Sequence, residues 1–132
     1  VNGNYMGAGI TFGEPSIEQL REQAELKAYS IRDIAMQAGF VYGEITIDTS
    51  LKAREIMSFA YAKAVENPEH VFNMILKDGT KVEITGADFV NIYQAMVTYG
   101  EALYNQCVQN IETIKTAEAS QLKKFIKDGV WE

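Results

Sequence analysis

Apolar residues recur at intervals of three and four positions along the segment that follows Thr85. They are Phe89, Ile92, Tyr93, Met96, Gly100, Leu103, Cys107, Ile111 and Ile114. This spacing is the period of an α-helix with one apolar face. Thr85, with Asp88 three residues later, is typical of a helix N-terminus. The pattern therefore predicts one long helix near residues 86–114.

This predicted helix contains no Lys or Arg, because none occurs between Lys81 and Lys115. Solvent-exposed helices of this length usually carry pairs of opposite charges on their outer side. Here those positions are mostly neutral polar residues, which are easier to desolvate than charged ones. We therefore predict a homo-oligomeric or partner interface on this helix. Its centre would comprise Tyr99, Glu101, Asn105, Gln106 and Gln109. The alternative is a central helix that the domain's own helices surround.

Two segments of alternating apolar and polar residues flank Asp78-Gly79, which predicts a β-hairpin over residues 71–84. A two-residue turn would mix apolar and charged side chains on one face of the hairpin. A three-residue turn with a left-handed Gly79 keeps the apolar side chains together, so we predict this register. Its cross-strand pairs are Met74 with Val82 and Phe72 with Ile84.

Further helices and one further strand complete the predicted order of elements. Ser16 and Gln19 form a capping-box signature for a first helix, and Gly39 ends it. Residues 40–47 predict a strand with a bend at Gly43. A second helix follows N-cap candidates at residues 48–50, and we expect Ile56 on its inner face. A short helix starts near Thr116 and ends at Asp128-Gly129. We predict an α+β fold in which one small antiparallel sheet of about three strands, including the hairpin, packs against the helices.

The chain of 132 residues is large enough for one hydrophobic core. Residues 1–15 contain four glycines and few charges, and we predict a glycine-rich arm or linker there. Residues 16–132 are predicted to form a single α+β domain. Because the sequence begins with Val1, we expect it to be a processed or excised piece of a longer protein.

Charge and the rare reactive residues narrow the functional classes. A net charge of −6 with few clustered basic residues argues against nucleic-acid binding. No apolar stretch approaches the length of a membrane-spanning helix, so we expect no membrane partner. The single His70 and single Cys107 form neither a metal-ligand set nor a catalytic pair with a third orienting group. We predict no catalytic, metal-binding or cofactor-binding residues, and no enzymatic activity.

Four segments carry a resemblance to a known family: GFVYGEITIDTS, FNMILKDGTKVEIT, GADFVNIYQAMVTYGEALYNQ and IKTAEASQLKKFIKDGVW. From Arg32 onward the sequence resembles a functionally uncharacterised domain of tail-associated proteins from tailed bacteriophages and prophages. The resemblance covers residues 32–131 and supplies no catalytic residues. The ending near Trp131 also resembles tail fibre assembly proteins.

The resemblance implies a non-enzymatic structural or assembly domain of a phage tail component, either tail fibre or baseplate-associated. Such a domain would contact other tail proteins or further copies of itself. It would reside in the host cytoplasm before assembly and in the virion tail afterwards. Two alternatives stay open: a small phage-encoded inhibitor that binds a host protein or small ligand, and a tail fibre assembly chaperone. A closed, polar-lined pocket would indicate the inhibitor, and absence from finished particles would indicate the chaperone.

Overall fold

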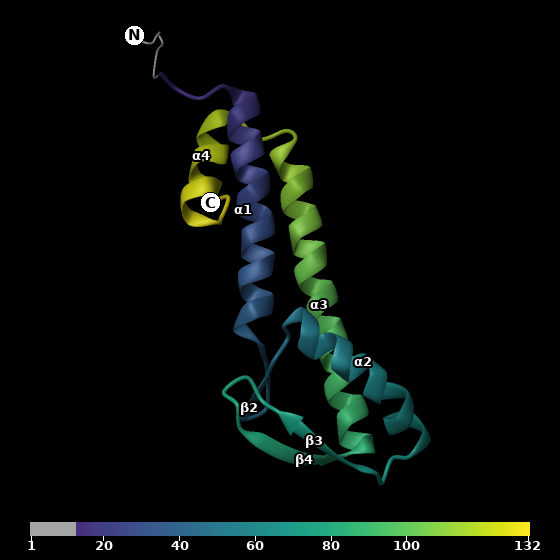
Figure 1. The fold of residues 1–132 in the computed structure, drawn as a ribbon. Coiled ribbons are helices and arrows are strands. Elements are labelled where there is room, and N and C mark those ends of the chain that lie inside the picture. The colour runs from purple at the N-terminus through teal and green to yellow at the C-terminus, as the bar shows by residue number, and fades with distance from the viewer. Residues whose placement is uncertain (1–12) are drawn as a thin grey trace. The chain divides into compact units, whose positions relative to one another are not determined.

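The computed structural model describes residues 13–132, which form four helices and four strands (Figure 1). The predicted α+β class and the predicted long helix are both confirmed. Of the predicted arm at 1–15, residues 1–12 lie outside the described residues. The elements in chain order are α1 (Ile17–Ala38), β1 (Phe40–Tyr42), β2 (Ile45–Ile47), α2 (Leu51–Glu66), β3 (Val71–Ile75), β4 (Lys81–Thr85), α3 (Gly86–Ile114) and α4 (Ala119–Asp128).

The chain divides into two compact units. The single domain expected over residues 16–132 stays a prediction. The first unit contains the chain up to Ala28 together with Asn110–Glu132, and the second contains Tyr29–Gln109. Both α1 and α3 therefore contribute residues to each unit.

Helices and their connections make up the described part of the first unit. Ser16 caps α1 as predicted, since its backbone N–H donates to Gln19 Oε1 at 2.8 Å and its Oγ accepts the Gln19 N–H at 3.1 Å. The Phe125 ring stacks on Trp131 with 4.3 Å between ring centroids, and Trp131 Nε1 donates to Asn110 Oδ1 at 3.1 Å. The buried apolar side chains of this unit are Leu20, Ala24, Ala28, Ile114, Ala117, Leu122 and Phe125.

The last helix begins at Ala119, three residues after the predicted start at Thr116. The intervening residues form a turn, in which the Ala117 N–H donates to the Thr113 carbonyl oxygen at 3.0 Å. Glu118 is the N-cap and forms a capping box with Gln121. The helix ends at a glycine in the left-handed conformation, as the sequence predicted.

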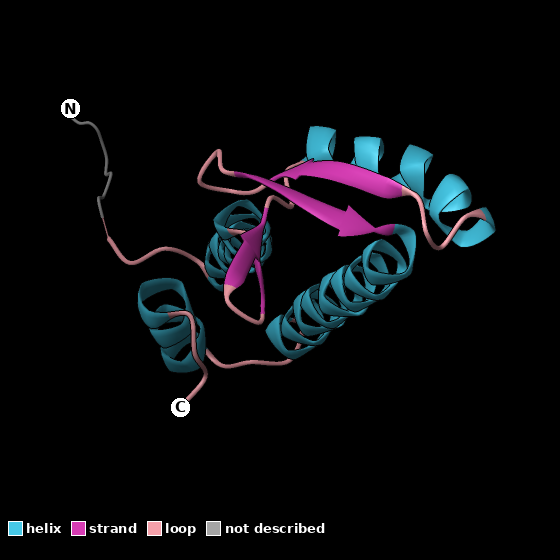
Figure 2. Cartoon of the chain, turned by 90° about the horizontal axis from the view of Figure 1, so that it is seen from below, coloured by secondary structure: helices cyan, strands magenta, loops and turns pink. Residues whose placement is uncertain are grey.

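The second unit contains the predicted hairpin, formed by β3 and β4 (Figure 2). The register is the predicted one, with Met74 opposite Val82 and Phe72 opposite Ile84. Gly79 has a φ of +89°, which is the left-handed conformation that the three-residue turn requires. Phe72, Met74, Val82 and Ile84 consequently share the core-facing side of the hairpin. The opposite side carries the charged Lys81 and Glu83 together with the exposed Val71 and Ile75.

The segment 40–47 forms two strands where we predicted one. Gly43 has a φ of +61°, and the chain reverses there so that Tyr42 pairs with Ile45. The single sheet of about three strands is therefore replaced by two antiparallel sheets of two strands each. One backbone hydrogen bond, from the Lys77 N–H to the Thr46 carbonyl oxygen at 3.0 Å, connects the two hairpins.

The main core of the second unit lies where α2 and α3 cover the inner face of the β3–β4 hairpin. Of the three N-cap candidates for α2, Ser50 performs the role, because its Oγ accepts the Ala53 N–H at 3.3 Å. Ile56 was expected on the inner face of α2, but 59% of it is exposed. The buried residues of this core are Ile47, Met57, Ala64, Met74, Leu76, Phe89, Ile92 and Met96.

Candidate functional site

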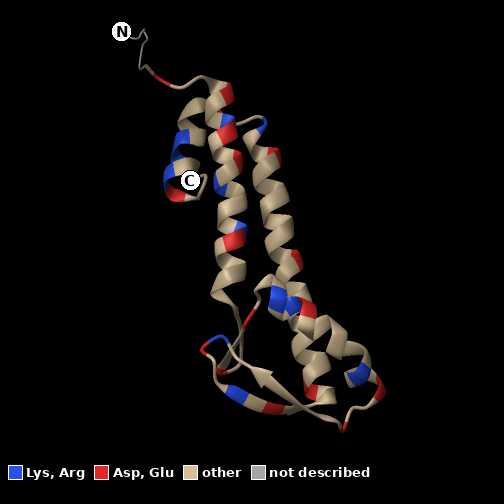
Figure 3. Cartoon of the chain, viewed as in Figure 1, with Lys and Arg blue, Asp and Glu red and all other residues tan. Residues whose placement is uncertain are grey.

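The long helix α3 carries very few charges along its whole length. Asp88, Glu101 and Glu112 are its only charged residues, and Figure 3 shows the helix as almost uninterrupted tan. This is the element on which the sequence predicted an interface. Which of its sides is free therefore decides where a partner can bind.

The five predicted interface residues do not share one face of α3. Glu101, Asn105, Gln106 and Gln109 are exposed, whereas Tyr99 is half-buried. The Tyr99 ring packs against the ring of Phe40 in β1, with 5.0 Å between their centroids. Tyr99 and Glu101 are two positions apart, so they lie about 200° apart around the helix axis. Tyr99 therefore belongs to the packed side, and Glu101, Asn105 and Gln109 lie on the solvent side. Gln106 is exposed as well, but it follows Tyr99 by seven positions and so lies within about 20° of it around the helix axis.

An apolar stripe on the solvent side of α3 was not recognised from the sequence. Val97 is 44% exposed, Tyr104 is 60% exposed and Val108 is 42% exposed. Together with Glu101 these residues follow each other at steps of four, three and four, which keeps them in line along the helix. We call Val97, Glu101, Tyr104 and Val108 the α3 stripe. The signal that could have revealed it is the seven-residue interval between Val97 and Tyr104.

The core face of α3 is a separate set of positions. Phe89, Ile92, Met96 and Cys107 are each at most 5% exposed. The helix thus carries two apolar stripes, and the domain's own residues bury only one of them. Water-exposed apolar residues that line up along a helix are typical of a surface that a second helix covers.

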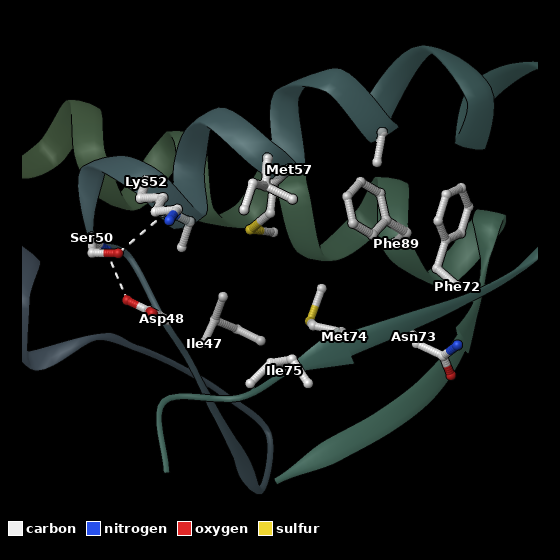
Figure 4. A pocket seen from close by; sticks show the side chains of 13 residues that line it. Ile47, Asp48, Ser50, Lys52, Met57, Phe72, Asn73, Met74, Ile75 and Phe89 are labelled. Atoms are coloured by element: carbon white, nitrogen blue, oxygen red, sulfur yellow. Dashed lines mark hydrogen bonds between the residues drawn. The ribbon is translucent and has the colours of Figure 1, made fainter. Parts of the chain in front are cut away.

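A second candidate site is a pocket of about 310 Å³ between α2 and β3 (Figure 4). Its walls are mostly apolar, and its polar end is formed by Asp48, Ser50 and Lys52. At this end the Ser50 N–H donates to Asp48 Oδ1 at 2.9 Å, so the carboxylate already has a backbone partner. Figure 4 shows Met57 and Phe89 on one side of the pocket and Met74 on the other. The lining residues are Ile47, Asp48, Ser50, Lys52, Ala53, Ile56, Met57, Ala60, Phe72, Asn73, Met74, Ile75 and Phe89.

A wider groove of about 640 Å³ contains the basic residues Arg32, Arg54 and Lys77. Two of these cations already have partners within the domain. Arg32 Nε donates to Asp33 Oδ1 at 3.0 Å, and this carboxylate raises the pKa of the guanidinium. Arg54 Nε donates to the Thr49 carbonyl oxygen at 3.0 Å. The groove therefore offers a weaker case for a binding site than the pocket does.

The described residues include no group of three or more His, Cys, Asp or Glu side chains that could hold a metal ion. Cys107 is buried on the core face of α3, and His70 packs edge-on against Phe72 at 4.6 Å between ring centroids. Within residues 13–132, none of the helices combines the length and the apolar character needed to cross a membrane.

The comparison with protein families adds one finding. Residues 19–126 match the family described as a domain of unknown function (DUF4376). The chain belongs to this family. The matched segment includes residues of both compact units, so the family pattern extends over both. No curated protein and no solved structure matches the chain.

Proposed function

We propose that this DUF4376 domain is a non-enzymatic structural and assembly module of a bacteriophage tail component, tail fibre or baseplate-associated. It acts through protein–protein contacts of the α3 stripe with further copies of itself or with other tail proteins. The observation that carries the interaction is the exposure of Val97, Tyr104 and Val108 on a helix without a basic residue. The resemblance of the sequence to tail-associated phage domains supports the biological setting.

The composition of α3 favours a protein interface over a solvated surface. Protein interfaces are depleted in Lys and enriched in Tyr, and α3 combines the absence of Lys with the exposed Tyr104. Removing these apolar side chains from water contributes about 25 cal/mol per Å² of buried apolar surface, against which the entropic cost of association is set. Covering the α3 stripe with a second apolar helix therefore makes a favourable contribution to the free energy of association.

Glu101 limits how two copies can pair through this stripe. A parallel pair in register would place the Glu101 carboxylates of the two copies against each other in a partly desolvated interface, which is unfavourable. An antiparallel pair can instead bring Tyr104 of one copy beside Glu101 of the other. The phenol hydroxyl can then donate a hydrogen bond to the carboxylate. We therefore propose an antiparallel arrangement for a self-assembled pair.

The ligand-binding alternative receives less support, and the chaperone alternative requires a separate test. A ligand-binding inhibitor would be indicated by a closed, polar-lined pocket, whereas the α2–β3 pocket is open and mostly apolar. An assembly chaperone would be present in infected or induced cells but absent from finished particles. Mass spectrometry of purified virions tests this point, because a structural component is retained in proportion to the other tail proteins.

The double variant Val97→Asp with Tyr104→Asp tests the interface. Sedimentation equilibrium of the unmodified chain should show an oligomer, and the double variant should sediment as a monomer with an unchanged circular dichroism spectrum. Phe59→Asp is the matched control, since Phe59 is 83% exposed on α2 and does not belong to the stripe. This control should remain oligomeric. A monomeric unmodified chain that is also absent from virions would overturn the proposal.

A further inference from the structure

The outer edge of β3 presents backbone groups that point away from its hairpin partner. The Leu76 N–H donates to the Thr80 carbonyl oxygen, and the Gly86 N–H donates to the His70 carbonyl oxygen, both at 2.8 Å. In an antiparallel pair, successive residues alternately form backbone hydrogen bonds with the partner strand and point their backbone groups away from it. The even-numbered residues of β3 therefore form hydrogen bonds with β4, and the backbone groups of the odd-numbered residues point outward. The Lys77 N–H follows this alternation, since it donates outward to Thr46. The edge is thus formed by Val71, Asn73 and Ile75, and β3 has no second strand partner among the described residues.

The two edges of this hairpin differ in chemical character. The residues of β4 whose backbone groups point away from β3 include Lys81 and Glu83. Charged side chains on an edge strand protect that edge from pairing with another strand. The corresponding residues of β3 are Val71 and Ile75, which are 54% and 60% exposed, with the neutral Asn73 between them. The β3 edge lacks the protection that the β4 edge has.

The apolar pocket opens beside the β3 edge. Figure 2 shows that β3 is the strand of the hairpin nearer to α2, and the pocket lies between these two elements. Ile56 of α2 and Ile75 of β3 both line the pocket while remaining more than half exposed. A strand added to β3 would direct every second side chain toward the pocket, on the side of Met74.

The positive charge of Lys52 at the polar end of the pocket favours an occupant with an acidic group. Lys52 lines this end and makes no ion pair with any described residue. The nearby Asp48 carboxylate accepts the Ser50 N–H. A carboxylate on the occupant would therefore complement the Lys52 ammonium group.

We propose that the β3 edge and the α2–β3 pocket bind an extended segment of a partner protein as an additional β-strand. Backbone hydrogen bonds to Asn73 and its odd-numbered neighbours hold the segment, its alternate apolar side chains fill the pocket, and an acidic group lies near Lys52. The α3 stripe lies on other residues, so this binding does not depend on self-assembly through α3. It gives the domain a second surface through which it can be joined to another component.

The test begins with a displayed library of random nine-residue peptides selected against the purified full chain. The expected winners carry apolar residues at every second position and an acidic residue toward one end. Two synthetic forms of the best peptide then carry backbone N-methyl groups on alternate residues, in opposite phases. One phase should lose affinity at least about tenfold because it removes N–H groups that face β3. The other phase should bind like the parent peptide.

Variants of the protein locate the site. Ile56→Asp should weaken peptide binding at least about tenfold, and Lys52→Glu should weaken it for the acidic peptide but not for its Asp→Asn or Glu→Gln form. Phe59→Asp, which lies on α2 but does not line the pocket, should bind normally. Amide exchange at Asn73 should slow when peptide is added.

Three results would overturn the inference. They are a library that yields no binder, a binder whose two N-methylated forms behave alike, and binding that Ile56→Asp leaves unchanged. The inference and the proposed function fail separately. The α3 stripe variants abolish self-association, whereas the Ile56 variant abolishes peptide binding in a chain that still assembles.

Discussion

Gly86, the first residue of α3, lies directly against the backbone carbonyl of Asn67, the C-cap residue of α2. A methyl group at Gly86 would overlap this carbonyl oxygen and come within 3.0 Å of the Ala64 carbonyl oxygen. The Gly86 N–H also donates to the His70 carbonyl oxygen at 2.8 Å. The absence of a side chain at this position therefore allows the end of α2, the start of β3 and the start of α3 to meet.

Gly86→Ala should consequently destabilise the domain by about 1–3 kcal/mol, because backbone atoms cannot move aside as a flexible side chain can. Gly100→Ala is the matched control in the same helix, since nothing lies within 4 Å of a methyl group there. This second change should be neutral or stabilise by up to about 1 kcal/mol, as replacing Gly in a helix interior does. Urea unfolding measures both variants. Equal stabilisation by the two changes would show that α2 and α3 do not approach each other as described.

The hairpin register predicts unequal effects of two aspartate substitutions. Met74 is 7% exposed and belongs to the core, whereas Lys81 is exposed on the opposite face. Met74→Asp should reduce the free energy of unfolding by several kcal/mol, because it buries a charge without a partner. Lys81→Asp should change it by about half a kcal/mol or less. Thermal denaturation distinguishes them, and similar losses from both would contradict the register.

The hairpin was predictable because each local signal agrees with the others. Asp78-Gly79 specifies the turn, and the alternation of apolar residues permits only the register that pairs Met74 with Val82. The strand at 40–47 offered no comparable evidence. Its three-residue arms are too short to show an alternation, so Gly43 could be either a bend within one strand or the turn between two. The left-handed conformation of Gly43 decides this, and it is not encoded by the spacing of residues alone.

The interface that the sequence predicts on α3 stays a prediction, and its proposed centre combines residues from different sides of this helix. The lack of basic residues is visible in the sequence and identifies α3 as the candidate interface helix. Which side is packed depends on contacts far apart along the chain, such as that between Tyr99 and Phe40. Val97 and Val108 were overlooked because apolar residues also form the core face of the same helix. Ile56 lines the α2–β3 pocket and yet is 59% exposed, because α2 covers less of the hairpin than its pattern suggests.

Two exposed carboxyl groups should titrate below the ordinary aspartate pKa of 3.8, for different reasons. The backbone N–H of Thr80 donates to the Asp78 carboxylate at 2.9 Å and lowers its pKa. A hydrogen bond from Lys124 Nζ at 3.0 Å lowers the pKa of Asp128. Each stabilises the folded state fully above the unfolded pKa, and this contribution disappears as the pH falls through the lowered folded pKa.

Carboxyl carbon NMR titrations of the variant Lys124→Met separate these two causes. Loss of the lysine should raise the pKa of Asp128 toward 3.8 and leave that of Asp78 unchanged. High salt should likewise affect Asp128 more, because screening weakens an exposed charge pair more than a hydrogen bond to the backbone. A parallel rise of both pKa values would show that the two carboxyl groups share a general electrostatic cause.

Lysine substitutions at Asn105 and Gln109 distinguish an interface on α3 from a merely solvent-exposed side. Both residues are exposed in the domain, so the double variant Asn105→Lys with Gln109→Lys should fold normally. The lysine introduced at the first of these positions would also stand four residues after Glu101, an order that stabilises helices by about 0.2–0.5 kcal/mol. Within an assembly, the new ammonium groups would have to be desolvated beside the α3 stripe. We therefore expect the dissociation constant of the oligomer to rise at least about tenfold while the melting temperature of dilute monomer stays the same. A lower melting temperature in dilute monomer would place this side inside the fold, and an unchanged sedimentation profile would remove it from the interface.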